Sequence, residues 1–483
     1  MRYCYEAFIY YFYIIFILFL VIINIQCNSG GNAIVTINVG TTPKISYLDH
    51  FLQLLTFAKK ANAAVSTNVA SISYKVEASD IETITGAIPL ETGSVTIELT
   101  PGNNRTFTIY AYDSNNFKIY ACKTTVDLQP GNNTVDIVME KTMFTIDSSS
   151  NIPDIDLAIG NGIPYIAYIK SSQINIKYLS ETLQTIDTTS LNYPADSLDL
   201  EYYNTLYIAS HFQNVNYYIN VSKFNGSSWG PLLDNGDDIS NVDNNPNTFS
   251  LKINSAGPYI AYIINDYYPA VKKYSEGATP KWDPVGSLST PQGGDISMAY
   301  DSANNIYIAY TTSMPTAIEV KKYSGSSWSN FPNTSTPPTY NPMEVSIAID
   351  GNDVVYVAHR NNINPSRVAV VKCPQNGTEW TPAAGSDMYV SGTIKAAQDI
   401  QMAFDGNNRL YVVYYDFNSD YSNYQLHIKR VNGSNWEEVD VINLPAKHYV
   451  FSPKIAIRGD VCYIAYVDCY DSQRDVILYK IML

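Results

Sequence analysis

The chain has 483 residues, of which 46% are apolar and only 16% are charged, with 30 Lys and Arg against 45 Asp and Glu. The formal net charge of −15 counts against nucleic acid as a partner, because a phosphate backbone needs a positive face. The 41 Tyr residues, and a charged fraction below the roughly 25% of ordinary domains, favour β-structure over helix bundles.

An apolar leader opens the chain. Residues 1–27 combine a short head with an apolar run of marginal membrane-spanning length and end at Cys27, and residues 28–32 form a flexible polar tether. This arrangement resembles a bacterial lipoprotein signal, although Gln26 and Asn24 depart from the usual pattern before the cysteine. The resemblance implies lipidation of Cys27 and anchoring in the cell envelope or at the cell surface. An uncleaved anchor and a plain secretory signal are the alternatives, and each of the three exports the rest of the chain.

Residues 33–140 predict a domain of short alternating strands. Turns rich in Pro, Gly and Asn separate these strands, examples of which are expected at 33–39, 69–76, 93–99, 106–112 and 134–139. The pattern is typical of an immunoglobulin-like or fibronectin-like β-sandwich serving as a spacer. Apolar residues near 46–60 have helical spacing, which predicts a short helix packed on the sandwich or, alternatively, lying on the bilayer.

An aromatic–aliphatic core then recurs seven times. The first Tyr of each copy is separated from the next by 42, 52, 48, 49, 55 and 52 residues, and these residues are Tyr165, Tyr207, Tyr259, Tyr307, Tyr356, Tyr411 and Tyr463. Seven strand-rich units of this length predict a seven-bladed β-propeller. The fold class is therefore all-β, with the sandwich followed by a propeller over residues 143–483. Residues 143–146 are expected to supply the missing fourth strand of the last blade, which would leave no open edge.

All five Trp residues occupy the turn before a fourth strand, in a Gly-x-x-Trp pattern that is stretched once: Trp229, Trp282, Trp328, Trp380 and Trp436. The glycine would supply a positive φ, and the indole would seal the packing between blades. The motif resembles a degenerate Asp-box, the repeat of sialidase-like propellers, without the usual Asp. In that family the box is structural, so the resemblance implies a fold and no activity.

The loops between second and third strands, with the connections between blades, define one candidate binding face. Its predicted ligand-binding residues are His211, Asp266, Tyr267, Tyr268, His359, Arg360, Asp416, Asp420, Tyr421, His448, Tyr449, Asp471 and Arg474. Tyr rings beside Asp and Asn suit sugars, and a propeller loop face equally suits a protein partner. We expect a membrane-anchored envelope protein that binds a protein or a glycan by this face.

The chemical alternatives are weaker. Three His residues on one face would suit a metal, yet no short His spacing or acid–His pair supports one, and none of the four body cysteines has metal-ligand spacing. A loose structural Ca²⁺ at 416–420 or 234–238 competes with solvated turns, because the loop at 416 lacks the Gly and final acid of an EF-hand. No catalytic set or cofactor is predicted. An extracellular glycosidase or lyase is the alternative function, and a purely structural envelope protein is the third.

Overall fold

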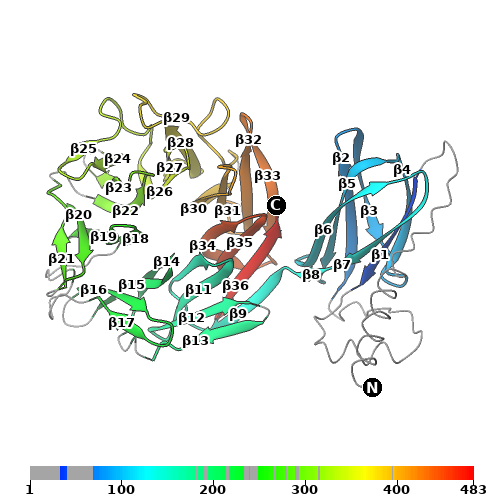
Figure 1. Ribbon diagram of the computed structural model, residues 1–483, viewed down its shortest axis with the longest axis horizontal. Coiled ribbons are helices and arrows are strands. Elements are labelled where there is room, and N and C mark those ends of the chain that lie inside the picture. The colour runs from blue at the N-terminus through cyan, green and yellow to red at the C-terminus, as the bar shows by residue number, and fades with distance from the viewer. Residues whose placement is uncertain are drawn as a thin grey trace, which may run out of the picture. The chain divides into compact units, whose positions relative to one another are not determined.

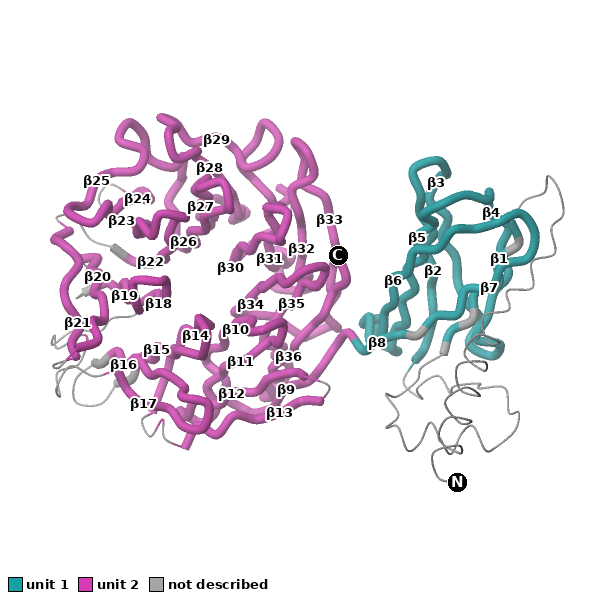
Figure 2. The backbone as a smooth tube through the Cα atoms, viewed as in Figure 1, with its two compact units in different colours: residues 1–141 teal, residues 142–483 magenta. Residues whose placement is uncertain are grey.

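The computed structural model describes most of the N-terminal and C-terminal parts of the chain after its leader. The described residues are 33–40, 69–180, 182–189, 191, 194–213, 217–232, 239, 248–264, 268–277, 280–288, 293–313, 316–393 and 395–483. The predicted leader, tether and helical segment near 46–60 lie outside them. Among the described residues there is no helix, and hence none with the length and hydropathy to cross a membrane. The chain divides into two compact units, residues 1–141 and 142–483 (Figure 2).

The first unit contains two sheets that share one core. One sheet has the order β4 (Ser94–Leu99), β1 (Ala33–Gly40), β7 (Gly131–Val138), and β1 pairs antiparallel with β4 but parallel with β7. The other sheet has the order β3 (Ile81–Ile88), β2 (Ser71–Ala78), β5 (Gly102–Tyr112), β6 (Lys118–Leu128), β8 (Glu140–Lys141). Alternate residues of β1 and β2 are buried in a common cluster, as period-two burial requires of two stacked sheets. The immunoglobulin-like class of this unit stays a prediction.

A buried arginine fixes one end of this unit. Arg105 is only 1% exposed, and its guanidinium forms a paired contact with the Asp80 carboxylate, with Nη2 lying 3.0 Å from Oδ2. It also donates to the carbonyl oxygens of Thr100 at 3.1 Å and Pro101 at 3.0 Å. The charge is thus compensated by an acid and by two backbone groups of the β4–β5 turn, as a buried cation requires.

The second unit consists of seven four-stranded antiparallel sheets arranged in a ring (Figure 1). The prediction of an all-β chain with a β-propeller is confirmed. From the inside outward, the sheets are β10 (Ile155–Gly160), β11 (Ile163–Lys170), β12 (Gln173–Leu179), β13 (Leu183–Ile186); β14 (Ser197–Tyr203), β15 (Thr205–Gln213), β16 (Tyr217–Phe224), β17 (Trp229–Pro231); β18 (Phe249–Asn254), β19 (Gly257–Ile264), β20 (Tyr268–Ser275), β21 (Lys281–Pro284); β22 (Gly293–Tyr300), β23 (Ile306–Ser313), β24 (Thr316–Tyr323), β25 (Trp328–Asn330); β26 (Pro342–Ile349), β27 (Val355–Asn361), β28 (Arg367–Cys373), β29 (Thr381–Pro382); β30 (Ala396–Phe404), β31 (Leu410–Phe417), β32 (Gln425–Asn432), β33 (Asn435–Asn443); and β34 (Tyr449–Arg458), β35 (Val461–Tyr470), β36 (Gln473–Met482), β9 (Met143–Ser149).

The seventh sheet joins the two ends of this unit. Strand β9 pairs antiparallel with β36, and Thr145 lies opposite Ile477. Ile146 of β9 is buried in the core that the first and seventh blades share. The last blade therefore has four strands like the others, and its outer strand comes from the start of the unit, which closes the ring.

The recurrent Tyr core forms the second strand of every blade. Each such strand packs against both neighbouring blades, so it is apolar on both faces, as strands buried on both sides are. In six of the seven blades the first Tyr lies directly opposite a Lys or Arg of the third strand, as in Tyr207–Lys223 and Tyr307–Lys322. The ammonium groups of these two lysines lie 5.5 Å and 5.0 Å from the ring centroids, within range of a cation–π contact.

Each Trp packs in the core between its own blade and the preceding one. The indole Nε1 of Trp282 donates to the Leu232 carbonyl at 2.7 Å, and that of Trp328 donates to the Val285 carbonyl at 2.6 Å. The glycines before Trp229, Trp328 and Trp436 have φ of 99°, 88° and 61°. The prediction of a positive φ is wrong for the other two, Gly277 and Gly377.

Candidate functional site: the central channel and an aromatic platform

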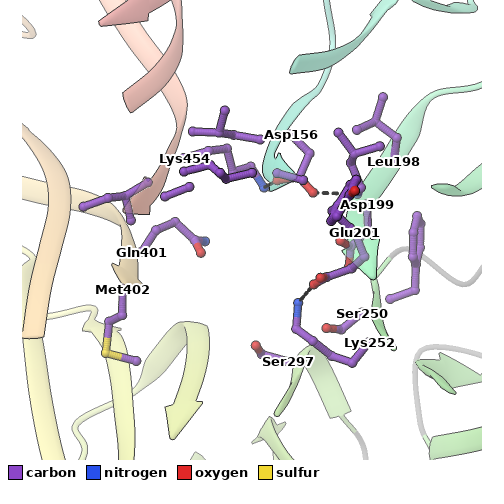
Figure 3. Close-up of a pocket in the computed structure, with 18 of the residues that line it drawn as sticks. Asp156, Leu198, Asp199, Glu201, Ser250, Lys252, Ser297, Gln401, Met402 and Lys454 are labelled. Carbon is purple, nitrogen blue, oxygen red and sulfur yellow. Dashed lines mark hydrogen bonds and ion pairs between the residues drawn. The ribbon is translucent and has the colours of Figure 1, made fainter. Parts of the chain in front are cut away.

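The innermost strands of the blades surround a central channel. A cavity of about 430 Å³ lies here, with residues from all seven innermost strands in its wall (Figure 3). Charged and polar side chains dominate this wall: Asp156, Asp199, Glu201, Ser250, Lys252, Asp295, Ser297, Gln401 and Lys454. A channel of this size and polarity is the first place to look for a ligand.

Most of the channel acids already have a structural partner. Innermost strands of neighbouring blades do not pair with each other, so their inward N–H groups need another acceptor. Side chains of one blade supply it to the next: Asp154 to Leu198 N (2.9 Å), Asp156 to Leu200 N (2.7 Å), Asp199 to Leu251 N (2.7 Å), Ser250 to Met298 N (3.2 Å), Asp295 to Val345 N (2.9 Å), Ser297 to Ile347 N (3.2 Å), Glu344 to Asp399 N (2.8 Å) and Asp399 to Ser452 N (3.2 Å).

The hydroxyl of Ser452 donates to Asp154 Oδ1 at 3.3 Å, so these bonds cross all seven junctions and return to the first blade. We call these nine acceptor and donor residues the belt. Burial raises the pKa of the Asp295 carboxyl group to about 6 and that of Glu344 to about 7, although neighbouring N–H donors and Arg360 act in the opposite direction. Lys252, paired with Glu201, and Lys454, 3.7 Å from Asp156, balance part of the negative charge.

The belt accounts for most of the carboxylates in the channel by a structural role that requires no ligand. Within the described ranges no group of three His, Cys, Asp or Glu side chains is placed to hold a metal. A ligand that displaced one of these carboxylates from its N–H donor would break the junction. The candidate binding surface is therefore sought outside the channel.

Three residues predicted on exposed loops lie instead inside strands. His359 is 0% exposed within β27, and His211 in β15 and Asp416 in β31 are buried as well. The second strands continue past the Tyr core before they turn, which the sequence pattern did not show. His211 Nδ1 lies 2.6 Å from Asp196, and Asp416 lies 3.1 Å from His427 Nε2 and 3.2 Å from Lys395 Nζ, so these contacts are internal. Burial lowers the pKa of His359 to about 4, which keeps it neutral.

The remaining predicted residues separate into groups. Arg360 forms an ion pair with Glu344 at 2.8 Å beside the channel. Tyr268 is exposed at the start of β20, while Asp266 and Tyr267 lie outside the described residues. The other six, from the sixth and seventh blades, occupy or flank three neighbouring loops of one face: Asp420, Tyr421, His448, Tyr449, Asp471 and Arg474.

A continuous set of aromatic rings, which we call the aromatic platform, runs from the buried end of β31 over these loops to the start of β34: Tyr415, Phe417, Tyr421, Tyr424 and Tyr449. Phe417 is stacked between Tyr421 and Tyr424, with ring centroids at 5.4 Å and 4.9 Å and interplanar angles of 17° and 23°. Tyr449 of the seventh blade continues the set, 6.2 Å from Tyr424. Tyr421 is 74% exposed and Tyr449 is also exposed, so the platform presents ring surface to solvent.

The loop holds Tyr421 in an unusual conformation. Its φ is +57°, in the left-handed region that bulky residues avoid. The turn is fixed by Tyr421 N donating to Asn418 O at 2.9 Å and by Asp420 Oδ1 accepting from Ser422 Oγ at 2.5 Å. Backbone strain of this kind concentrates at functional sites, because the surrounding contacts must maintain it.

Polar groups border the platform on the seventh blade. His448 stacks on Tyr470 at 4.5 Å, and its Nδ1 lies 3.0 Å from both carboxylate oxygens of Asp468. Arg474 donates to Ile152 O at 2.9 Å. The sequence prediction missed the contributions of Tyr415, Phe417 and Tyr424 to the platform. The recurrence of aromatic residues at 417, 421 and 424 was the one available signal.

The comparisons with known proteins concern the fold. No protein-family model matches the chain, and no curated protein matches it. A lectin from Burkholderia pseudomallei is 12% identical over 69% of this chain and 97% of its own, with a TM-score of 0.46. The fucose-specific lectin from Aleuria aurantia is 14% identical over 63% and 99%, with a TM-score of 0.40, and a Hadza microbial sialidase is 9% identical over 86% and 90%, with a TM-score of 0.39. The likeness is to the propeller fold alone, so the interpretation of the site rests on its own residues.

Proposed function

We propose that this chain is a carbohydrate-binding propeller that uses the aromatic platform. The observation that carries the proposal is the array of Tyr421, Phe417, Tyr424 and Tyr449 on two adjacent blades, in which Phe417 is buried between its neighbours while Tyr421 and Tyr449 are exposed. A pyranose ring has an apolar face of C–H groups that packs on tyrosine rings, and its hydroxyl groups hydrogen-bond at the edges. Sites of this kind combine aromatic walls with a few fixed polar groups.

The border of the platform suits such a ligand. His448, held by Asp468, supplies a ring nitrogen, and Asp420 and Asp471 supply exposed carboxylates on the two flanking loops. Carboxylates accept hydrogen bonds from sugar hydroxyls at neutral pH, and an extended array of rings suits more than one sugar unit. A protein partner is the competing occupant of the same face.

We place this binding function at the cell envelope. The leader's resemblance to a lipoprotein signal, with Cys27 as the lipidated residue, supports export and anchoring, and the sparsely charged, Tyr-rich body is consistent with an extracellular surface. In this arrangement the N-terminal unit, which we infer to be immunoglobulin-like, is a spacer between the anchor and the propeller.

A glycan array tests the proposal directly. The full chain should give hits that weaken by about tenfold or more in Tyr421→Ala and Tyr449→Ala, since tenfold corresponds to about 1.4 kcal/mol. Tyr340→Ala, which removes an exposed tyrosine from the fifth blade, is the matched control and should retain the hits. A blank array, or equal losses in all three variants, would overturn carbohydrate binding at the platform. A protein would then be the favoured partner of this face. Repeating the array with EDTA shows whether a cation takes part.

A further inference from the structure

A second cavity lies between the second and third blades. It has a volume of about 390 Å³, and its wall comes from the β14–β15 turn, the β18–β19 turn and the end of β20. In an antiparallel blade the turns between first and second strands lie on the face opposite the loops between second and third strands. This cavity is therefore on the face opposite the aromatic platform. It exceeds the roughly 300 Å³ at which small-molecule sites begin.

The cavity has aromatic walls and a charged rim. Tyr203, Tyr207 and Tyr274 line it, the last two being buried. The Lys223 ammonium lies 5.5 Å from the Tyr207 ring centroid and 3.8 Å from the Glu276 carboxylate. Glu276 is 76% exposed along its side chain, so this pair is loose and both groups remain able to bind another partner.

A buried amide adds a hydrogen-bond donor. Asn254, only 2% exposed, lines the cavity, and its Oδ1 accepts from Ala256 N at 2.8 Å. Its Nδ2 has no hydrogen-bond partner in the described part of the chain. The corresponding turns of the fourth to sixth blades carry Asp301, Asp350 and Asp405, which accept bonds rather than donate them. A buried donor without an acceptor is costly, and a ligand oxygen would remove that cost.

The junction of the fourth and fifth blades shows why the cavity exists. There Asp301 lies on the longer β22–β23 turn, 3.6 Å from Lys322, and the Gln375 Nε2 of the fifth blade donates to it at 3.0 Å. The second blade has a tight turn at Asn204 instead, in which Tyr203 and Thr205 pair directly, and no carboxylate occupies the equivalent place. Lys223 therefore has the exposed Glu276 as its ion-pair partner in place of a turn carboxylate, and the cavity lies beside this pair.

We propose that this inter-blade cavity binds a single neutral sugar residue with vicinal hydroxyl groups. Glu276 accepts from two hydroxyls, Lys223 and Asn254 Nδ2 donate to ring or hydroxyl oxygens, and the tyrosines pack on the apolar face. The choice of a sugar as ligand rests on the proposed function, whereas the site itself does not. One chain would then carry two carbohydrate sites on opposite faces.

The test measures binding of a panel of neutral monosaccharides to the full chain by saturation-transfer NMR and calorimetry. Glu276→Gln should weaken binding at least tenfold without affecting the fold, because this side chain is exposed. Glu379→Gln, at an exposed position of the fifth blade, is the matched control and should bind as the wild type does. Tyr203→Ala should weaken binding, and Tyr421→Ala should leave it unchanged.

The outcomes separate the two sites. Loss in Glu276→Gln with retention in Tyr421→Ala supports the cavity site. If monosaccharides bind and their affinity is unchanged in Glu276→Gln, the cavity site is overturned. It is also overturned if no monosaccharide of the panel binds while the glycan array still gives hits that depend on Tyr421. A failure of both assays overturns the cavity site together with the proposed function.

Discussion

Replacement of Trp282 by Phe, compared with the same replacement of Trp380, measures the hydrogen bond between blades. Both indoles are buried between neighbouring blades, and both substitutions remove the same atoms from similar cores. They differ in one respect: Trp282 Nε1 donates to the Leu232 carbonyl at 2.7 Å, whereas Trp380 Nε1 has no partner among the described residues. The packing loss, which is common to both, therefore cancels in the comparison.

The expected difference follows from this geometry. Trp282→Phe leaves a carbonyl without its donor, at about 1–2 kcal/mol, while Trp380→Phe removes a buried unsatisfied donor and regains about 1 kcal/mol. We expect Trp282→Phe to be the more destabilising substitution by about 2 kcal/mol. For a unit of this size, that corresponds to a melting shift of roughly 2–4 °C.

Urea unfolding of the full chain measures the free energy of unfolding of both variants, provided that the dependence of this free energy on urea concentration is the same in each. Circular dichroism is the readout, because tryptophan fluorescence would change with the substitution itself. Equal losses in the two variants would show that the indole bond contributes nothing to the junction. A larger loss for Trp380→Phe would refute the reasoning from hydrogen bonding altogether.

Three further predictions concern the belt, the closing strand and the first unit. Because burial raises the carboxyl pKa of Asp295 to about 6 and of Glu344 to about 7, the folded propeller holds protons that the unfolded chain releases. The free energy of unfolding should therefore fall as the pH rises from about 4 to 7. In urea titrations, Asp295→Asn should reduce this dependence of stability on pH. Ile146→Asp would bury a charge at the β9–β36 closure and should cost several kcal/mol, whereas Thr145→Asp, on the exposed side of the same strand, should be near neutral in thermal melts. Arg105→Lys cannot reproduce the paired contact with a carboxylate and should destabilise the first unit by about 1.5–3 kcal/mol, seen as a shift in its own unfolding transition.

The propeller was predictable because its signal is repeated. Each second strand is buried on both faces and so carries the same Tyr-led apolar core, and the Trp turns recur at the blade junctions for the same reason. The first unit has no internal repeat. There the strands β3, β6 and β8 were not among the examples named from the sequence, and the parallel pairing of β1 with β7 has no local sequence signal.

The belt could not be predicted because three residue types perform one task. Asp, Ser and Glu side chains all accept a hydrogen bond from a backbone N–H of the next blade, so no single residue type recurs at a fixed period. Two belt residues, Asp399 and Ser452, also have φ of +52° at irregularities in strands β30 and β34. Such bulges redirect a side chain by one position, which a period-two pattern cannot show. The platform was predicted only in part for a similar reason, because its stacking depends on the conformation at Tyr421.

The belt also bears on where binding sites lie in this molecule. Its carboxylates accept backbone N–H groups at five of the seven junctions, so a ligand that displaced Asp199 or Asp295 from these bonds would leave Leu251 N or Val345 N without an acceptor. Each such loss costs about as much as a sugar hydroxyl would gain. The exposed side chains of Tyr421 and Tyr449 in the platform and of Glu276 at the inter-blade cavity belong neither to the belt nor to the Trp contacts or the β9 closure. We therefore expect that a change of side chain at the platform on one face, or in the inter-blade cavity on the other, alters the affinity for a ligand without opening the propeller.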